Sequence, residues 1–452
     1  ISGASTVTMQ VARLMEPKPR TIPNKLREMA QALRIELKYS KDEIMKIYLI
    51  HAPYGGNIIG YRTASLRYFG CEPEQLSWAQ AATLAVLPNN PANVNPMRNP
   101  DQLKIKRDGL LLRLLESGTI DRPTYDLALA EHLPRGTLPF PVAAPHLAER
   151  LARTVNENLI TTTINKEIQE QVSKLLGGYV SELGSRGIRN GAVLVTDTAT
   201  GEVKAYVASQ DYFDDSNLGK IDGVQMRRSL GSTLKPFLYA LAMDEGIIVR
   251  ESVLMDVPTY YGGFTPYNAD RKFSGIVRAD TALMRSLNAP AVQLLNNLGV
   301  GEFLHFLKEG GLEGLVDSPE HYGLSLILGS AQGSLWELSR MYRGLANYGL
   351  FSDLTVLPHQ SGEEERLISA GSSFLVLETL KEVARPGLDY YWRDYQSSAP
   401  LGWKTGTSFG NYDAWAVGAS PQWTIGVWVG NFAGGEIKDL SGIDSAAPLL
   451  FR

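Results

Sequence analysis

The chain has 452 residues, of which 44% are apolar and 20% charged, a balance that is typical of globular domains and excludes global disorder. A single cysteine, Cys71, excludes a disulfide within the chain, and six scattered histidines without HExxH spacing disfavour a metal site. The net charge of −4 combines a basic excess in the first part with an acidic excess in the rest. No apolar run is long enough to predict a transmembrane helix.

Residues 1–133 are predicted to be helical. One helix is marked by an apolar stripe at helical spacing. The next is expected to begin at Ser40, because Glu43 follows three residues later as in a capping box. Further helices are expected at 77–87 and 102–115. The stripe consists of Leu26, Met29, Ala30, Leu33 and Leu37.

Residues 134–165 are predicted to form a linker region, which separates a domain at 1–133 from a domain at 166–452. Three closely spaced prolines, at 134, 139 and 141, favour extended backbone. Within this region we expect a helix at about 145–157 and a short β-branched strand at 161–164.

The domain at 166–452 is predicted to be α/β. A helix at 167–177 precedes a β-hairpin formed by 191–197 and 202–208. Helices dominate 232–350, and three strands are expected near the end of the chain. These last strands are 403–407, 413–418 and 423–429. Together with the hairpin they predict one five-stranded, mostly antiparallel sheet flanked by helices, with helices inserted between its halves.

Three short motifs with chemical meaning occur in order in this domain. Ser232 begins an SxxK motif, Ser286 an SxN motif and Lys404 a KTGT motif. Each is weak alone, but their order and predicted settings together indicate a serine acyltransferase. Ser232 is the predicted nucleophile, and Lys235 lies three residues on, on the same face of a helix, as its base.

Electrostatics and backbone geometry complete this prediction. Burial and the second cation of Lys404 are expected to lower the pKa of Lys235. The backbone amides of Ser232 and Thr407 are the expected oxyanion donors. Gly406 is expected to let substrate backbone lie close to its strand, because it has no side chain.

Residues 165–452 resemble the transpeptidase domain of the class A penicillin-binding proteins. The resemblance is carried by the sequences around the three motifs and by Asp413-Ala414-Trp415-Ala416-Val417-Gly418. It implies attack on a D-Ala-D-Ala stem peptide of peptidoglycan, inhibition by β-lactams and no required cofactor. It also implies roles for Lys235 as base, Ser286 as proton relay and Asn288 as substrate ligand, with Lys404, Thr405 and Thr407 on the substrate carboxylate.

The first part of the chain resembles the family's lysozyme-like, all-α peptidoglycan glycosyltransferase domain, most closely in the 1C subtype. Residues 3–10 are similar to its GxSTxTQQ motif and 24–28 to its RKxxE motif. The resemblance implies that Glu28 is catalytic and that lipid II is bound by Ser5, Thr6, Gln10, Lys25 and Arg27. It allows a divalent cation for glycosyl transfer, and it implies a membrane anchor, an extracytoplasmic location and no nucleic-acid partner.

The sequence departs from the family's usual residues at three positions. Met9, Asn24 and Ile50 stand where the family usually has Gln, Arg and Asn. The family's first motif, with the carboxylate that activates the acceptor sugar, is expected upstream of Ile1. The glycosyltransferase segment is therefore expected to be incomplete in this sequence.

The sequence predicts a bifunctional cell-wall synthase, and two alternatives stay open. In a D,D-carboxypeptidase or β-lactamase of the same fold, water would take the acyl group. No ExxLN-type deacylation base occurs, which disfavours a class A β-lactamase. A non-catalytic scaffold would not need the complete set of motif residues.

Overall fold

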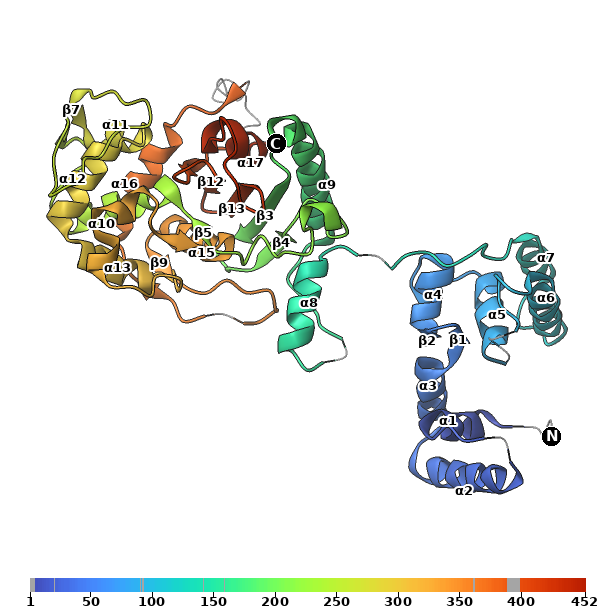
Figure 1. Ribbon diagram of the computed structural model, residues 1–452. Helices are drawn as coiled ribbons and strands as arrows, with labels where there is room; N and C mark the ends of the chain where they lie inside the picture. The colour runs from blue at the N-terminus through green and yellow to red at the C-terminus, as the bar shows by residue number, and fades with distance from the viewer. Residues whose placement is uncertain are drawn as a thin grey trace. The chain divides into compact units, whose positions relative to one another are not determined.

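The structure is a computed structural model that describes residues 5–19, 21–89, 91, 93–140, 142–157, 159–360, 362–387 and 399–452. Its contacts divide the chain into two compact units, Ile1–Val142 and Ala143–Arg452 (Figure 1). No helix within these described ranges is long and apolar enough to cross a membrane.

The N-terminal unit is helical, as predicted. Its helices are α1 (Val7–Met15), α2 (Ile22–Lys38), α3 (Lys41–His51), α4 (Tyr61–Phe69), α5 (Trp78–Val86), α6 (Pro100–Glu116) and α7 (Arg122–Ala130), with a small hairpin of β1 (Pro53–Gly55) and β2 (Ile58–Ile59). The predicted capping box is confirmed, because Ser40 Oγ accepts from Glu43 N–H and the Glu43 carboxylate accepts from Ser40 N–H. One core cluster forms around the hairpin and α4, where Tyr68 OH donates to the carbonyl of Tyr54 at 2.9 Å.

Helix α2 carries the predicted apolar stripe, but the stripe is exposed. Leu26, Leu33 and Leu37 expose 63%, 66% and 89% of their surface. Ala32 is the one buried residue of this helix. The polar side of α2 instead contacts α1, where Thr8 Oγ1 donates to Glu36 at 2.6 Å. The periodicity therefore predicted the helix correctly but did not predict how it packs.

The C-terminal unit is built on a five-stranded sheet, in agreement with the prediction (Figure 1). Its strands lie in the order β11 (Gly402–Thr407), β12 (Asp413–Ala419), β13 (Trp423–Gly430), β3 (Asn190–Asp197) and β4 (Val203–Val207). Every neighbouring pair is antiparallel. β11 is an edge strand, so one side of its backbone is free of sheet partners.

Side chains alternate between the two faces of this sheet, as the two-residue period of a strand requires. Leu194, Trp415 and Trp428 belong to a core on one face, whereas Val193, Ala414 and Val429 belong to a core on the other. Helix α15 (Leu335–Ala346) packs against the first face. Helix α9 (Lys166–Leu183) and the terminal α17 (Ala447–Leu450) pack against the second. Both faces are covered, so most residues of these strands are buried.

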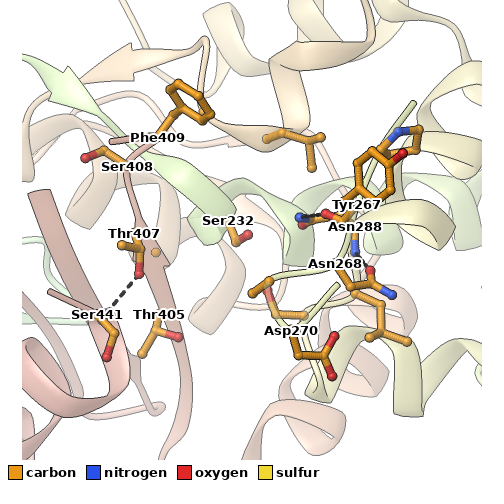
Figure 2. Close-up of a pocket in the computed structure, with 18 of the residues that line it drawn as sticks. Ser232, Tyr267, Asn268, Asp270, Asn288, Thr405, Thr407, Ser408, Phe409 and Ser441 are labelled. Atoms are coloured by element: carbon orange, nitrogen blue, oxygen red, sulfur yellow. Dashed lines mark hydrogen bonds between the residues drawn. The ribbon is translucent and has the colours of Figure 1, made fainter. Parts of the chain in front are cut away.

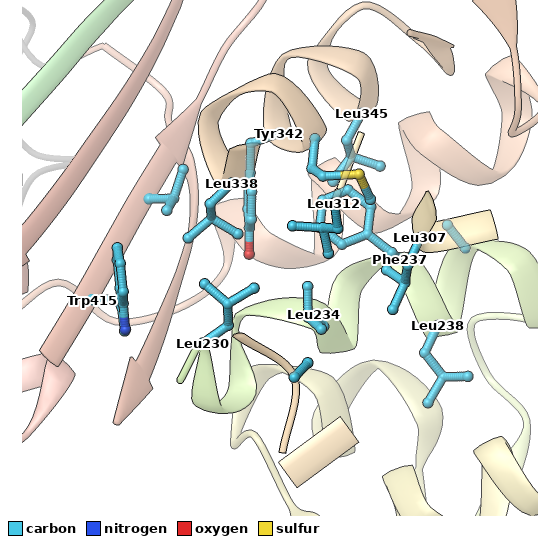
Figure 3. Packing of buried hydrophobic residues seen from close by; sticks show 14 of the residues in the cluster. Leu230, Leu234, Phe237, Leu238, Leu307, Leu312, Leu338, Tyr342, Leu345 and Trp415 are labelled. Atoms are coloured by element: carbon cyan, nitrogen blue, oxygen red, sulfur yellow. The ribbon is translucent and has the colours of Figure 1, made fainter. Parts of the chain in front are cut away.

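Most helices are inserted between β4 and β11, as expected. They are α10 (Lys235–Asp244), α11 (Ala279–Met284), α12 (Asn288–Leu298), α13 (Val300–Glu309), α14 (Pro319–Tyr322), α15 and α16 (Ala370–Lys381). Helix α10 is buried over its first eight residues. Figure 3 shows Leu234 and Phe237 beside Leu338 and Tyr342 of α15, and the rings of Phe237 and Tyr342 meet edge to face at 5.1 Å. Each such buried side chain contributes about 1.5–3 kcal/mol, which holds this helix firmly.

The division between the units falls inside the interval 134–165 that was expected to be a linker. Helix α8 (Pro145–Thr154) lies in this interval, and its Leu147 and Leu151 belong to the core of the C-terminal unit. The strand expected at 161–164 is wrong. Thr163 N–H donates to the carbonyl of Val356 at 2.9 Å, and this segment forms no ladder.

Candidate active site

Ser232 lies in a 3₁₀ turn, Gly231–Leu234, that leads directly into α10. The turn is fixed from two sides, because Trp415 Nε1 donates to the carbonyl of Ser229 at 2.8 Å and Tyr342 OH donates to that of Thr233 at 2.7 Å. Gly231 has a φ of +56°, and any Cβ there would meet the backbone of Thr407. Glycine therefore lets the serine turn approach β11.

Lys235 is fully buried and its amine is held by the SxN motif. Nζ donates to the carbonyl of Ser286 at 2.7 Å, to Asn288 Oδ1 at 2.6 Å and more weakly to Ser286 Oγ at 3.4 Å. In the described part of the chain no hydrogen bond joins Lys235 to Ser232. The helical spacing predicted that Lys235 can reach Ser232, but it did not predict that the amine is oriented by Ser286 and Asn288.

Burial sets the protonation of the two lysines. It lowers the pKa of Lys235 well below its usual range, and the nearby charge of Lys404 lowers it further. Burial also lowers the pKa of Lys404 to about 7. Both causes favour the neutral form of the Lys235 amine, which a general base requires.

The SxN motif occupies a tight turn between α11 and α12. Ser286 has a φ of +55°, a conformation that a non-glycine residue adopts at a cost and that often marks functional sites. Asn288 is the first residue of α12, and besides accepting from Lys235 it donates through Nδ2 to the carbonyl of Tyr267 at 2.7 Å. An amide has two donor hydrogens and two acceptor lone pairs, so each end of Asn288 keeps capacity for a ligand.

The KTGT motif forms β11 along the opposite side of the cleft (Figure 2). Thr407 Oγ1 accepts from the N–H of Gly442 at 3.0 Å, and Lys404 Nζ donates to the carbonyl of Thr405 at 2.8 Å. The predicted reason for Gly406 is wrong. A Cβ at that position would collide with the carbonyl of Leu230 and with Thr233, so the glycine admits the protein's own serine turn rather than substrate.

The structure gathers all eight predicted transpeptidase residues at one cleft. Ser232, Ser286, Asn288, Lys404, Thr405, Gly406 and Thr407 line it, and Lys235 lies just beneath. Figure 2 shows Ser232 between Thr405 and Thr407 on one side and Asn288 on the other. No sequence pattern predicted the second wall of the cleft, which comprises 264–271 and carries Tyr267 and Asn268.

In the N-terminal unit, two of the predicted residues, Ser5 and Lys25, meet beside Glu28. Its carboxylate accepts two hydrogen bonds from Arg13, at 2.8 and 2.9 Å, and lies 3.4 Å from Lys25 Nζ. Lys25 Nζ also donates to Ser5 Oγ at 2.5 Å. The bond from Arg13 lowers the pKa of Glu28, which therefore stays ionised. Arg13 was missed, although it follows Gln10 by one helical turn.

The other predicted residues of this unit lie apart from the Glu28 carboxylate. Thr6 is the N-cap of α1, and its hydroxyl accepts from Met9 N–H at 3.2 Å. Gln10 is half-buried on α1, and Arg27 is exposed on α2. Within the described residues, no group of three His, Cys, Asp or Glu side chains is arranged to hold a metal ion.

Known proteins resemble both units. Residues 1–115 match the family model described as transglycosylase, and 191–437 match the penicillin binding protein transpeptidase domain. The chain is 37% identical over 450 residues to penicillin-binding protein 1C of Escherichia coli K12, covering all of this chain and 58% of that protein. It thus spans less than two thirds of this curated relative.

Two solved structures share the fold. Penicillin-binding protein 1A of Haemophilus influenzae matches with a TM-score of 0.65 and 18% identity, over 98% of this chain and 86% of that one. PonA1 of Mycobacterium tuberculosis, in complex with penicillin V, matches with a TM-score of 0.55 and 20% identity, over 76% of this chain and 91% of that one. With the matched transpeptidase model covering more than half of the sequence, the chain belongs to the class A penicillin-binding proteins, which combine a transglycosylase and a transpeptidase domain.

Proposed function

We propose that this protein is a peptidoglycan synthase whose C-terminal unit cross-links stem peptides through an acyl-enzyme at Ser232. The observation that carries the proposal is the state of Lys235, a fully buried amine with a lowered pKa, fixed by Ser286 and Asn288 beside the serine turn. A buried amine of this kind has little structural value but is suited to accept a proton.

In the proposed reaction, Ser232 Oγ attacks the carbonyl between the two terminal D-alanines while its proton passes to Lys235, directly or through Ser286 Oγ. The amides of Ser232 and Thr407 stabilise the oxyanion. The close approach of Gly231 to the Thr407 backbone supports this pairing of donors. The C–N bond then breaks, and the departing D-alanine amine takes the proton.

The second half of the reaction regenerates the serine. An amine of a neighbouring stem attacks the ester, its proton passes to the lysine, and Ser232 leaves as a hydroxyl. The free edge of β11 supports this substrate class, because an extended peptide can add to it as a further strand. Lys404, Thr405 and Thr407 are proposed to hold the terminal carboxylate, with Asn288 as a further ligand.

For the N-terminal unit we propose a part in glycosyl transfer from lipid II. The cations around Glu28 support binding of a pyrophosphate, and Glu28 is proposed to orient Arg13 and Lys25. Glu28 is thus proposed to act through its charge, because its pKa is lowered and its carboxylate is already paired with Arg13. A divalent cation has no carboxylate cluster to hold it in the described residues, so no step is assigned to one.

The proposed setting is the outer face of the cytoplasmic membrane, with an anchor, and nucleic acid is not among the proposed partners. The decisive experiment is labelling of the intact chain by a penicillin, followed by peptide mass spectrometry. We expect one ester adduct at Ser232, and an adduct elsewhere or none would contradict the proposal. Supplying an amine acceptor to an acyl-enzyme made from a D-Ala-D-Ala peptide then separates transpeptidation from a carboxypeptidase, which releases only the hydrolysed peptide.

A further inference from the structure

The second wall of the cleft connects two short strands. β6 (Val253–Asp256) and β7 (Gly275–Arg278) pair antiparallel, and the segment between them passes the cleft at 264–271. Figure 2 shows Tyr267 and Asn268 of this segment beside Asn288. The ring of Tyr267 is more than half exposed, whereas Asn268 exposes only 4% of its surface. Tyr267 is therefore exposed at the cleft, whereas the next residue, Asn268, is buried against the start of helix α12.

Asn268 is held by hydrogen bonds at both ends of its amide. Nδ2 donates to Asp256 Oδ1 at 2.7 Å and to the carbonyl of Lys272 at 2.8 Å. Oδ1 accepts from the backbone N–H of Asn288 at 2.7 Å and more weakly from that of Ala289 at 3.4 Å. This pattern uses both donors and the acceptor, so the orientation of the side chain is determined.

The carboxyl group that anchors Asn268 is itself fully buried. Asp256 accepts from Asn268 through one oxygen and from Ser274 N–H, at 2.8 Å, through the other. A buried carboxyl group without such partners would be costly. The hydrogen bond between Asp256 and Asn268 therefore stabilises the buried position of both side chains.

Asn268 provides the hydrogen-bond acceptor that the N-terminus of helix α12 lacks in its own N-cap residue. Helix α12 begins at Asn288, and its N-cap residue, Leu287, provides no side-chain hydrogen bond. The first N–H groups of a helix need acceptors from elsewhere. Asn268 supplies that acceptor from a distant segment, so the position of Asn288 depends on it.

Asn288 in turn fixes the position of the Lys235 amine. Its Oδ1 accepts from Lys235 Nζ at 2.6 Å, and its Nδ2 is fixed by the carbonyl of Tyr267, the neighbour of Asn268. A continuous chain of hydrogen bonds thus runs from Asp256 through Asn268 and Asn288 to Lys235.

We propose that Asn268, anchored by Asp256, is a positioning residue for acyl transfer, which holds Asn288 and through it the amine of Lys235 in place. The inference rests on the proposed function, since it assigns Lys235 the role of base. Small displacements of catalytic groups have large effects, about 100-fold for 1 Å. Loss of Asn268 should therefore slow acylation without removing any group that reacts.

The test is a double-mutant cycle on the whole chain. The acylation rate constant with a fluorescent penicillin is measured for the parent, Asn268→Ala, Asn288→Ala and the double variant. We expect Asn268→Ala to slow acylation about 10- to 100-fold in the parent but only about 2-fold in the Asn288→Ala background, because coupled residues are not additive. Equal factors in both backgrounds, or normal acylation by Asn268→Ala, would overturn the inference.

A matched control separates positioning from general damage. Gln169 is also a buried amide that accepts from a backbone N–H and donates to carbonyls, but it joins α9 to β4 away from the cleft. Gln169→Ala should leave acylation unchanged, even where it lowers the thermal midpoint as much as Asn268→Ala does. Slowing by Gln169→Ala to the same extent would contradict positioning.

A polarity swap covers the case in which Asn268→Ala does not fold. Asn268→Asp keeps an acceptor for Asn288 but turns a carboxyl group toward Asp256, and it should slow acylation. Adding Asp256→Asn restores one hydrogen bond in the reverse direction and should recover most of the rate. No recovery would count against the inference. A parent chain that is not acylated at Ser232 would instead refute the proposed function itself.

Discussion

Both candidate sites contain lysines, but their surroundings differ in charge. In the C-terminal unit Lys235 and Lys404 are buried, near each other, and hydrogen-bonded to neutral oxygens. In the N-terminal unit Lys25 is about one third exposed and lies beside the carboxylate of Glu28. Within the described residues, neither Lys235 nor Lys404 has a carboxylate partner.

This difference in the surroundings of the lysines favours a different chemistry at each site. A buried amine without a counter-ion loses its proton easily and can act as a base. Cations that are paired with a carboxylate keep their charge and are suited to bind a phosphate group. These surroundings support the proposal that the C-terminal unit performs proton transfer and that the cluster around Glu28 binds a phosphate group electrostatically.

The largest expected effect tests the nucleophile. Ser232→Ala should abolish acylation by a penicillin, since it removes the hydroxyl that is proposed to form the ester. The lost hydroxyl should cost about 1 kcal/mol of stability or less. Mass spectrometry of the treated protein measures the adduct, and Ser330→Ala, another serine of the same cleft, is the control that should still be labelled. Labelling of Ser232→Ala at the parent rate would contradict the assignment.

Replacing the base should be nearly as damaging. Lys235→Ala is expected to slow acylation by about 1,000-fold or more, because the members of a catalytic unit act together. Lys235→Arg should not restore the rate, since a guanidinium stays charged and cannot accept the proton. Stopped-flow acylation measures both variants. Recovery by arginine would show that positive charge, rather than proton transfer, is what the site needs.

Removing the second cation should shift the pH dependence. Lys404 is charged below its pKa of about 7, and its charge lowers the pKa of Lys235. In Lys404→Met the pKa of Lys235 should rise, so the acidic limb of the acylation profile should move to higher pH. A surface control, Lys438→Met, should leave the limb unchanged. An unshifted limb in Lys404→Met would mean that the two amines do not interact.

The sequence predicted the elements whose signals are local. The five strands, helix α10 and the three motifs follow from short patterns, and they fix most of the cleft. Asn268 could not be found this way, because it lies in an irregular segment and acts only through contacts made 20 residues later along the chain. The exposed stripe of α2 has a related cause, since periodicity predicts an apolar face but not the surface that covers it.

If each unit contains its own site, the C-terminal unit should work alone. A piece that begins at Ala143 keeps α8 and should be acylated at the rate of the whole chain. A piece that begins at residue 160 loses Leu147 and Leu151 from the core and should be less stable by a few kcal/mol. Limited proteolysis should cut near Arg135, and thermal unfolding compares the pieces. Slow acylation of the longer piece would show that the N-terminal unit supports the cleft.

The smallest expected effect concerns the carboxylate of the N-terminal unit. Glu28→Gln breaks the ion pair with Arg13 and should cost about 1 kcal/mol or less, because the pair is partly exposed. Arg13 lowers the pKa of Glu28 in the folded state, so this stabilisation is present above the unfolded pKa of about 4.3 and is lost as pH falls through the folded pKa. Urea unfolding should therefore distinguish the variant from the parent at pH 7, and the difference should shrink as pH falls through the lowered folded pKa of Glu28. Glu116→Gln, an exposed control, should match the parent at every pH. Penicillin acylation should stay unchanged. In the full-length protein, polymerisation of lipid II should fall, because Arg13 and Lys25 lose the group that orients them. A stability difference that persists at low pH would mean that Glu28 acts by packing rather than by charge.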